Sequence, residues 1–450
     1  MLKWFLGGRE AQSSVEKSSV LCIGEEQPKN CFTELQVLKG HFDIVRFLVQ
    51  IDDFRCASAG DDGLVLVWNV ETGERLQELR GHSQQITAIT TFTCHDEATS
   101  HTSLITASSD RSLSLWDPDT GNRVQTISDL QSVKCLLVLE RLCMWISGGE
   151  ELCVWNKDLE LQCQKQNHSD TGITAMIELP KNCIAAAMDK DIAIYKLTIS
   201  TDSPPSVAEI RHLSDHQDQI RALINVNDDL FASGSHAGEL VLWDATELKI
   251  LAYEHILWEE SQASAQMEIR VGGAPKPSEM SVQHLTTNGK LILAAVGSGL
   301  YVYSVQTKTV VAYRKVAHDS NVLHTMLMSD SELMSCSEDG SVRMWEIQDL
   351  PLPAEPTSPG FFGMWNFSRS NKQSGPPSKK VVDLPSMRTL ELTGDLIGHS
   401  GAVQMFLKFS EDALVTCSAD HLLILWKNGE RQSHLRSLAL FQKLEEKGGL

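Results

Sequence analysis

The stretch that decides the fold is SCSEDGSVRMWE, residues 335–346, because altered copies of it recur along the chain. Four further copies read SAGDDGLVLVWN at 58–69, TASSDRSLSLWD at 106–117, SGSHAGELVLWD at 233–244 and TCSADHLLILWK at 416–427. Every copy has a serine or threonine ten positions before a tryptophan. Four copies also have an aspartate six positions before it, and Ala237 takes that place in the fifth. Such a repeat indicates one supersecondary unit used several times.

A histidine precedes each copy, and a strand-like run follows it: His41, His82, His216, His318 and His399. Short apolar runs alternate with clusters of Gly, Asp, Asn and Ser, which is typical of an all-β chain with tight turns. The combined pattern resembles the WD40-repeat family, in which each unit forms a four-stranded blade of a β-propeller. We therefore predict a hydrogen-bonded structural network in each of four blades, made by His41, Ser58, Asp62 and Trp68; His82, Thr106, Asp110 and Trp116; His318, Ser335, Asp339 and Trp345; His399, Thr416, Asp420 and Trp426.

The same residue types, Ser or Thr with His and Asp, also make the triad of serine hydrolases. An active site is not normally repeated in several blades, whereas buried polar groups need hydrogen-bond partners in every blade. We therefore expect a structural role for these residues and no enzymatic activity. No metal or cofactor is expected, because the chain has no Cys-x-x-Cys pair and no third ligand accompanies His212 and His216.

Three weaker copies fill the gaps between the strong ones. They read SGGEELCVW at 147–155, AAMDKDIAIY at 186–195 and AVGSGLYVY at 295–303, and the last two end in tyrosine where tryptophan is expected. Counting them gives eight blades. Seven blades are the alternative if one weak copy is not a true blade.

The ends of the repeat region predict how the ring closes. Residues 33–38 form a strand-like run before the first histidine, and the last unit has only three strands. A ring has no free edge only if the leading strand completes the last blade. We expect an N-terminal extension at 1–32, a propeller at 33–430 with a long insertion at 350–390, and a helical tail at 431–450.

The tail contains strong helix formers and no proline or glycine between residues 433 and 446. Leu435, Leu438, Phe441 and Leu444 form an apolar ladder along this helix. A helix of about fifteen residues is only marginally stable alone in water. We therefore predict that these four residues dock on the propeller or on a partner.

The insertion starts with a proline-rich stretch and continues with a cluster of large apolar residues: Phe361, Phe362, Met364, Trp365 and Phe367. A polar, locally basic stretch follows at 368–380. Loops of this length in compact domains are usually functional or disordered. The cluster either folds back on the propeller or is an exposed recognition segment, and we favour recognition because large aromatics anchor interfaces.

The composition limits the classes of partner. The formal charge of −20 disfavours phosphate backbones, so we expect no nucleic acid partner. No apolar run approaches eighteen residues, so we expect no transmembrane segment. The eleven scattered cysteines are typical of reduced thiols in a cytoplasmic protein.

Individual stretches carry a closer resemblance. The residues at 6–10, 317–324, 336–343, 360–365, 394–399, 417–422 and 426–431 are similar to the WD repeat-containing protein 41 family of vertebrates. This resemblance implies a non-catalytic scaffold in a complex with two DENN-domain proteins, the Smith–Magenis syndrome chromosome region candidate 8 protein and the product of chromosome 9 open reading frame 72. It also implies regulation of small GTPases and autophagy, and recruitment to lysosomes, for which we expect a lysosomal membrane protein as a further partner.

Two other functions of WD40 propellers have sequence signatures of their own. A substrate receptor of a cullin-type ubiquitin ligase is the alternative, although such receptors usually show Trp-Asp-x-Arg and neither Trp116-Asp117 nor Trp243-Asp244 is followed by that arginine. A G-protein β-type subunit would need a heptad helix before the ring, and residues 1–30 show no heptad pattern.

Overall fold

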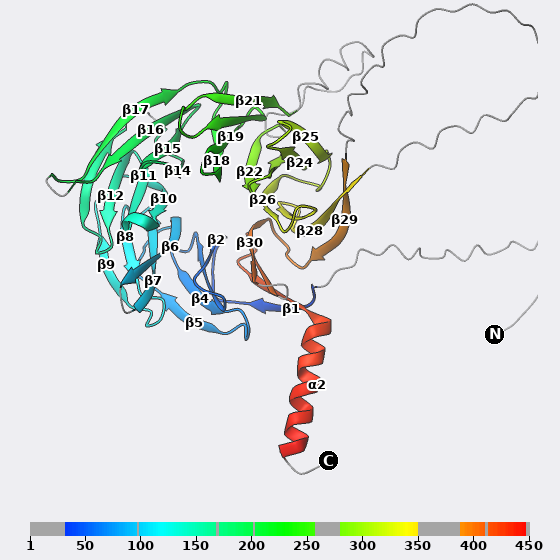
Figure 1. Ribbon diagram of the computed structural model, residues 1–450. Coiled ribbons are helices and arrows are strands. Elements are labelled where there is room, and N and C mark those ends of the chain that lie inside the picture. Colours follow the sequence, from blue (N-terminus) through cyan, green and yellow to red (C-terminus); the bar gives the residue numbers. More distant parts are fainter. Residues whose placement is uncertain are drawn as a thin grey trace, which may run out of the picture.

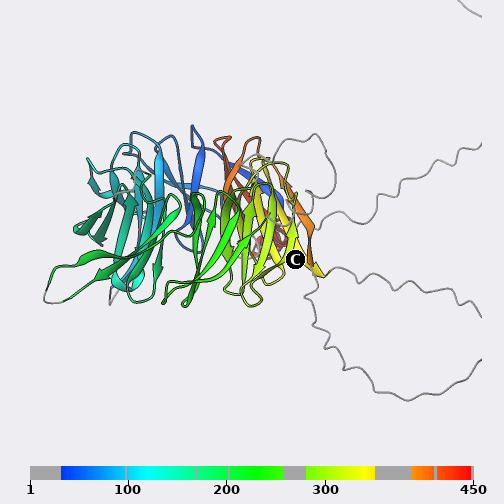
Figure 2. The same ribbon diagram turned by 90° about the horizontal axis from the view of Figure 1, so that it is seen from above.

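The computed structural model describes residues 32–96, 99–167, 171–200, 203–256, 280–349, 388–409 and 413–446. They form a ring of antiparallel sheets, seen along its axis in Figure 1 and from above in Figure 2. The first four blades, numbered along the chain, are β2 (Val45–Gln50), β3 (Arg55–Gly60), β4 (Val65–Asn69) and β5 (Arg75–Leu79); β6 (Ile86–Asp96), β7 (Thr99–Ser108), β8 (Leu113–Trp116) and β9 (Arg123–Ile127); β10 (Val133–Leu139), β11 (Met144–Gly149), β12 (Glu151–Asn156) and β13 (Leu161–Gln166); β14 (Ala175–Leu179), β15 (Cys183–Met188), β16 (Asp191–Thr198) and β17 (Ser206–Leu213).

The second half of the ring repeats this order. Its four blades are β18 (Ile220–Asn227), β19 (Leu230–Ser235), β20 (Glu239–Asp244) and β21 (Ile250–His255); β22 (Val282–Thr287), β23 (Leu291–Val296), β24 (Gly299–Ser304) and β25 (Thr309–Arg314); β26 (Val322–Leu327), β27 (Glu332–Ser337), β28 (Ser341–Asp349) and β29 (Arg388–Ile397); β30 (Val403–Phe409), β31 (Ala413–Ser418), β32 (Leu423–Asn428) and β1 (Phe32–Leu38). A short 3-10 helix, η1 (Glu140–Leu142), connects β10 and β11. The predicted all-β WD40 propeller with eight blades is confirmed.

Closure of the ring occurs as predicted, through the N-terminal strand. β1 pairs antiparallel with β32, with Leu35 opposite Trp426 and Leu38 opposite Leu423. The innermost strand of each blade contacts the innermost strand of the next, and β30 contacts β2 across the closure. The last blade therefore gains its fourth strand from a segment almost 400 residues away in sequence.

The core lies between neighbouring blades. Third strands are buried on both faces, as in β4, where Val65 to Trp68 are all buried. Trp116 packs with Val65 and Val67 of the preceding blade, and Trp426 packs with Met334 and Val342. Outer strands such as β17 are largely exposed. The anchor tryptophans therefore join each blade to its neighbour as well as completing their own sheet.

The insertion and the tail leave the ring at identifiable places. β28 ends at Asp349 and β29 begins at Arg388, so the insertion joins the third and fourth strands of the seventh blade. β29 also pairs in parallel with β25, through Ala312 opposite Arg388, which links two blades into one eight-stranded sheet. The predicted C-terminal helix is confirmed as α2 (Gly429–Glu446), which follows β32 directly and extends away from the ring (Figure 1).

Candidate interaction sites and the blade networks

The sixteen residues predicted to form structural networks come together in four blades. In the seventh blade, the hydroxyl of Ser335 lies 2.7 Å from His318 Nε2 and accepts the indole N–H of Trp345 at 2.9 Å. His318 Nδ1 lies 3.0 Å from Asp339. The same set of contacts forms around Ser58, Thr106 and Thr416, as the following pairs show: His41–Ser58, Trp68–Ser58 and His41–Asp62; His82–Thr106, Trp116–Thr106 and His82–Asp110; His399–Thr416, Trp426–Thr416 and His399–Asp420.

Each aspartate closes the turn between the second and third strands of its blade. Asp339 accepts the backbone N–H of Asp319 at 3.0 Å and that of Ser341 at 2.9 Å, and it also accepts the Ser341 hydroxyl at 2.7 Å. Burial by itself would raise the pKa of Asp339, but the bonds from His318 and Ser341 outweigh it and lower the pKa. The carboxylate therefore holds the turn, the preceding loop and the histidine together.

This geometry does not suit a nucleophile. The Ser335 side chain is fully buried, and its oxygen is engaged by both His318 and Trp345. Burial lowers the pKa of His82, His216 and His399, because the charged imidazole loses hydration. Neutral rings with both nitrogens engaged stabilise the blade by satisfying buried polar groups.

The fifth blade has a complete network that the sequence pattern did not reveal. Glu239 supplies the carboxylate that Ala237 cannot, and it lies 3.2 Å from His216 Nδ1. It also accepts the Tyr253 hydroxyl and the Ser235 hydroxyl, each at 2.6 Å. His216 and Trp243 meet at the Ser233 hydroxyl, as in the other blades. The sequence did contain a signal, since an acidic residue stands two positions after Ala237, where the aspartate was expected. The longer glutamate side chain reaches the same histidine from there.

The weaker blades keep parts of the network. Trp155 donates its indole N–H to Ser147 at 2.9 Å in the third blade. In the fourth blade the hydroxyl of Tyr195 lies 4.0 Å from the sulfur of Met188, and burial raises the pKa of Tyr195 to about 12. Within the described part of the chain, the Tyr303 hydroxyl of the sixth blade has no hydrogen-bond partner. These blades depend more on apolar packing than on polar bonds.

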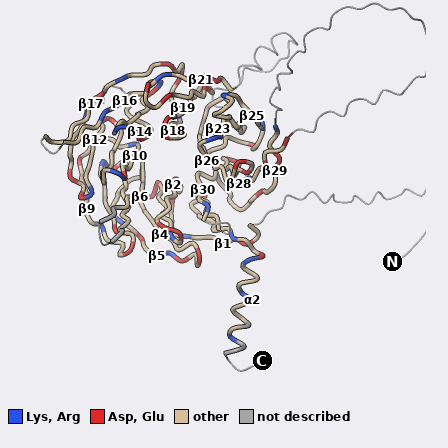
Figure 3. The backbone as a smooth tube through the Cα atoms, viewed as in Figure 1, with Lys and Arg blue, Asp and Glu red and all other residues tan. Residues whose placement is uncertain are grey.

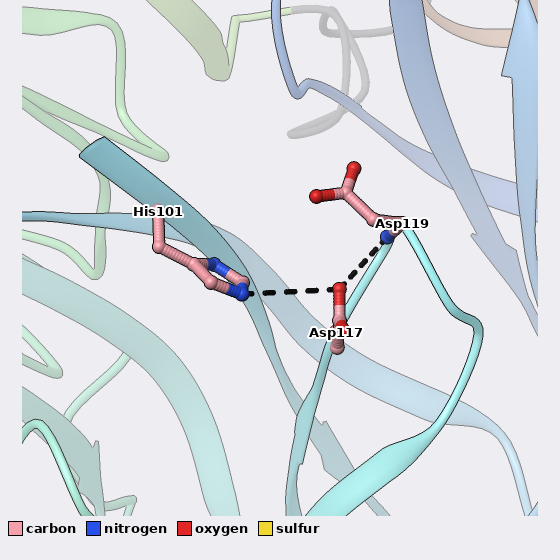
Figure 4. Close-up of side chains that lie close together, drawn as sticks. All are labelled: His101, Asp117 and Asp119. Atoms are coloured by element: carbon pink, nitrogen blue, oxygen red, sulfur yellow. Dashed lines mark hydrogen bonds and ion pairs between the residues drawn. The ribbon is translucent and has the colours of Figure 1, made fainter. Parts of the chain in front are cut away.

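One exposed group has the residue types of a metal site. His101, Asp117 and Asp119 lie close together at the edge of the second blade (Figure 4). His101 Nε2 is 4.0 Å from Asp117, which accepts the backbone N–H of Asp119 at 2.9 Å. Asp119 also pairs with Arg55 at 2.5 Å. Sequence reasoning did not single out these three residues, and Arg55 already neutralises part of their charge.

Of the nine residues predicted to bind partners, two have described side chains. Leu435 and Leu438 lie on α2 and are each 46% exposed, and Leu440 on the same helix is 59% exposed. The side chains of Phe441 and Leu444 are outside the described residues, as is the whole cluster Phe361, Phe362, Met364, Trp365 and Phe367.

Among the described residues, α2 contacts the ring at its base. Its contacts are with β1 and β32, and Arg436 pairs with Glu34 of β1 at 2.9 Å. Lys and Arg positions alternate with uncharged ones along its backbone trace, and acidic and basic positions are spread around the ring (Figure 3). Among the described residues, no helix is long and apolar enough to cross a membrane. Leu435 and Leu438, three positions apart on one side of the helix, therefore form an exposed apolar strip beside the closure of the ring, and Leu440 lies on another side.

Comparisons with known proteins agree with this architecture. The family model for the WDR41 β-propeller matches residues 1–436. WD repeat-containing protein 41 of Homo sapiens is 54% identical over 457 residues, which cover 100% of this chain and 99% of the human protein. The Mus musculus protein of the same name is 52% identical over 458 residues, with 100% and 99% coverage.

Among solved structures, the computationally designed Ika8 protein is similar in fold. Its TM-score is 0.61 with 18% identity, and the likeness covers 87% of this chain and 98% of the designed one. That likeness supports the propeller architecture alone. Propellers of this family act as scaffolds for protein interactions, which agrees with the closed ring and the exposed helix. By its sequence over the full length and by its fold, the chain belongs to the WD repeat-containing protein 41 family of β-propellers.

Proposed function

We propose that this chain is a non-catalytic scaffold subunit of a complex with two DENN-domain proteins, the Smith–Magenis syndrome chromosome region candidate 8 protein and the chromosome 9 open reading frame 72 product. The observation that carries the proposal is the exposed apolar surface of α2. Leu435 and Leu438 each expose close to half of their area on one side of a helix that touches the ring at its base. Exposed apolar surface of this kind marks interaction sites.

The position of α2 also suits a docking role. α2 continues directly from β32, and Arg436 adds an exposed ion pair to Glu34 of β1, which pairs with β32 along its length. A partner that binds α2 therefore meets a helix whose direction is already set, which lowers the ordering cost of binding. The recognition mode is an apolar helix face entering a groove of the partner.

The experiment is a pair of charge substitutions, Leu435→Glu with Leu438→Glu. We expect the ring to stay folded, because both side chains are exposed, and we expect co-purification with the DENN pair to fall at least about tenfold. Each apolar anchor at an interface contributes on the order of 1–2 kcal/mol or more, and 1.4 kcal/mol is a factor of ten.

The matched control is Ser433→Glu with Ser437→Glu, which adds the same charge to the opposite side of the helix. Both serines are exposed. The control should bind like the unmodified chain. If both double variants bind equally well, α2 is not the docking helix.

Recruitment of the complex to lysosomes is assigned in this proposal to the insertion. Its support is the sequence: an aromatic cluster at 361–367, a proline-rich stretch before it and Arg369, Lys372, Lys379 and Lys380 after it. A lysosomal membrane protein with an acidic groove is the expected receptor. Replacing residues 361–367 with Gly and Ser should abolish recruitment and leave binding to the DENN pair intact. Recruitment that persists after the replacement would remove the insertion from this role.

A further inference from the structure

A groove opens between the seventh and eighth blades, next to the start of the insertion. Its volume is about 270 Å³. Six largely apolar residues line it, three of them methionines, and we call it the methionine groove: Phe32, Met328, Leu333, Met334, Met344 and Trp345. Glu332, Glu346, Thr393 and Lys408 complete the lining.

The lining suits one large aromatic side chain. Phe32, Leu333, Met334 and Trp345 are buried, so the walls are held by the core between the blades. Methionine thioethers are adaptable and make favourable contacts with aromatic rings. The volume of about 270 Å³ is just below the range of small-molecule pockets, which starts at about 300 Å³, so the groove suits one or two side chains of a peptide segment and not the whole of it.

The position of the groove relative to the rest of the chain indicates an occupant. Glu346 is only three residues before Asp349, where β28 ends and the insertion begins. From residue 350 to residue 360 the chain can span up to about 35 Å. The aromatic cluster at 361–367 can therefore reach a groove that lies beside its own attachment point.

Charge favours the same occupant. Two carboxylates, Glu332 and Glu346, line the groove with a single ammonium group, Lys408. The insertion carries four basic residues after the aromatic cluster and no acidic residue between positions 361 and 382. An aromatic segment followed by positive charge complements a largely apolar groove whose lining has more acidic than basic residues.

We propose that the methionine groove binds the aromatic segment 361–367 of the same chain. The aromatic segment then has two alternative partners, the groove within the chain and the receptor outside it. Binding in the groove competes with binding to the receptor, because one segment cannot occupy both. The competition rests on the proposed role of the insertion in recruitment, whereas the groove contact itself does not.

The test uses a fluorescent peptide of residues 358–372 and two forms of the full chain. One form is unmodified, and in the other residues 361–367 are replaced with Gly and Ser. Fluorescence anisotropy should show that the replaced chain binds the peptide and that the unmodified chain binds it at least about tenfold more weakly, because the tethered segment competes at high effective concentration. Equal binding to both forms, or binding to neither, would overturn the proposal.

Two further variants locate the contact. In the replaced chain, Glu332→Lys with Glu346→Lys should weaken peptide binding about tenfold, and added salt should reduce that difference. The control Glu74→Lys with Asp158→Lys makes the same charge change at exposed positions in turns of the first and third blades and should have no effect. Equal losses from both pairs would show binding by charge alone and would contradict the groove assignment.

The N-terminal segment is the competing occupant, because residues 1–31 lead directly into Phe32. Deleting residues 1–30 should leave peptide binding to the unmodified chain weak. If that deletion alone uncovers the groove, the N-terminal segment is the occupant and the proposal is wrong. No lysosomal or DENN partner is present in these titrations, so their result is independent of the proposed function.

Discussion

Removing one blade carboxylate, by Asp339→Ala, should destabilise the ring by an amount that its contacts define. The carboxylate makes bonds of 3.0 Å to His318 and 2.7 Å to the Ser341 hydroxyl, and it accepts two backbone N–H groups. His318 is fully buried, and after the substitution the Ser341 hydroxyl, 3.1 Å from its Nδ1, is its one remaining partner on that nitrogen among the described residues, while the two backbone N–H groups lose theirs. Leaving a buried group unsatisfied costs about 1–3 kcal/mol, so we expect a loss of about 2–3 kcal/mol in the free energy of unfolding.

Urea denaturation followed by tryptophan fluorescence measures this loss, because Trp345 belongs to the same network. The matched control is Asp330→Ala. Asp330 also pairs with a cation, Lys290 at 2.8 Å, but its side chain is 63% exposed. Exposed ion pairs contribute at most about 1 kcal/mol, so the control should be nearly neutral. If the two variants lose the same stability, the blade network has been assigned to the wrong residues.

Three other expectations follow from the same structure. Deleting residues 1–38 removes β1 and exposes the edge of β32, so the thermal midpoint should fall sharply, and an unchanged midpoint would refute closure by this strand. His421→Gly should stabilise the chain by up to about 1 kcal/mol in the same urea assay, because His421 has a φ of 67°, which favours glycine. Gly340 takes the same turn position in the seventh blade with a φ of 84°. Destabilisation would show that the His421 side chain is needed. His82, His216 and His399 and the blade carboxylates have lowered pKa values in the folded state, so the unfolded chain binds protons first as the pH falls. The free energy of unfolding should therefore fall as the pH drops below about 6.5, where histidines titrate, and again below about 4, where carboxylates titrate. A flat profile between pH 7 and pH 5 would contradict the histidine assignment.

Most of the fold could be predicted from the repeat, because its residues determine both the local strand geometry and the packing between blades. Trp345 and Ser335 are ten residues apart, which is the spacing that places them side by side on adjacent strands. The count of eight blades followed from tolerating tyrosine at positions 195 and 303, since both side chains are buried where tryptophan is elsewhere. Closure of the ring by the N-terminal strand could be predicted because the last unit has only three strands of its own.

Other features depend on distances that a sequence pattern does not contain. Glu239 replaces an aspartate from a different position, and its role depends on the reach of its side chain to His216. The parallel pairing of β25 with β29 depends on two outer strands meeting across the gap between blades. The methionine groove collects residues from β1, β26 to β29 and β30 and their connections, and no local pattern relates them.

The central claim is that this ring is a scaffold for a pair of DENN-domain proteins. Affinity purification of the tagged full-length chain from cells, with quantitative mass spectrometry, tests it most directly. The account predicts that both DENN-domain proteins are recovered in amounts close to that of the tagged chain, and that the Leu435→Glu, Leu438→Glu variant loses both. Recovery of a cullin and its adaptor in comparable amounts, without the DENN pair, would contradict it and support a substrate receptor of a ubiquitin ligase.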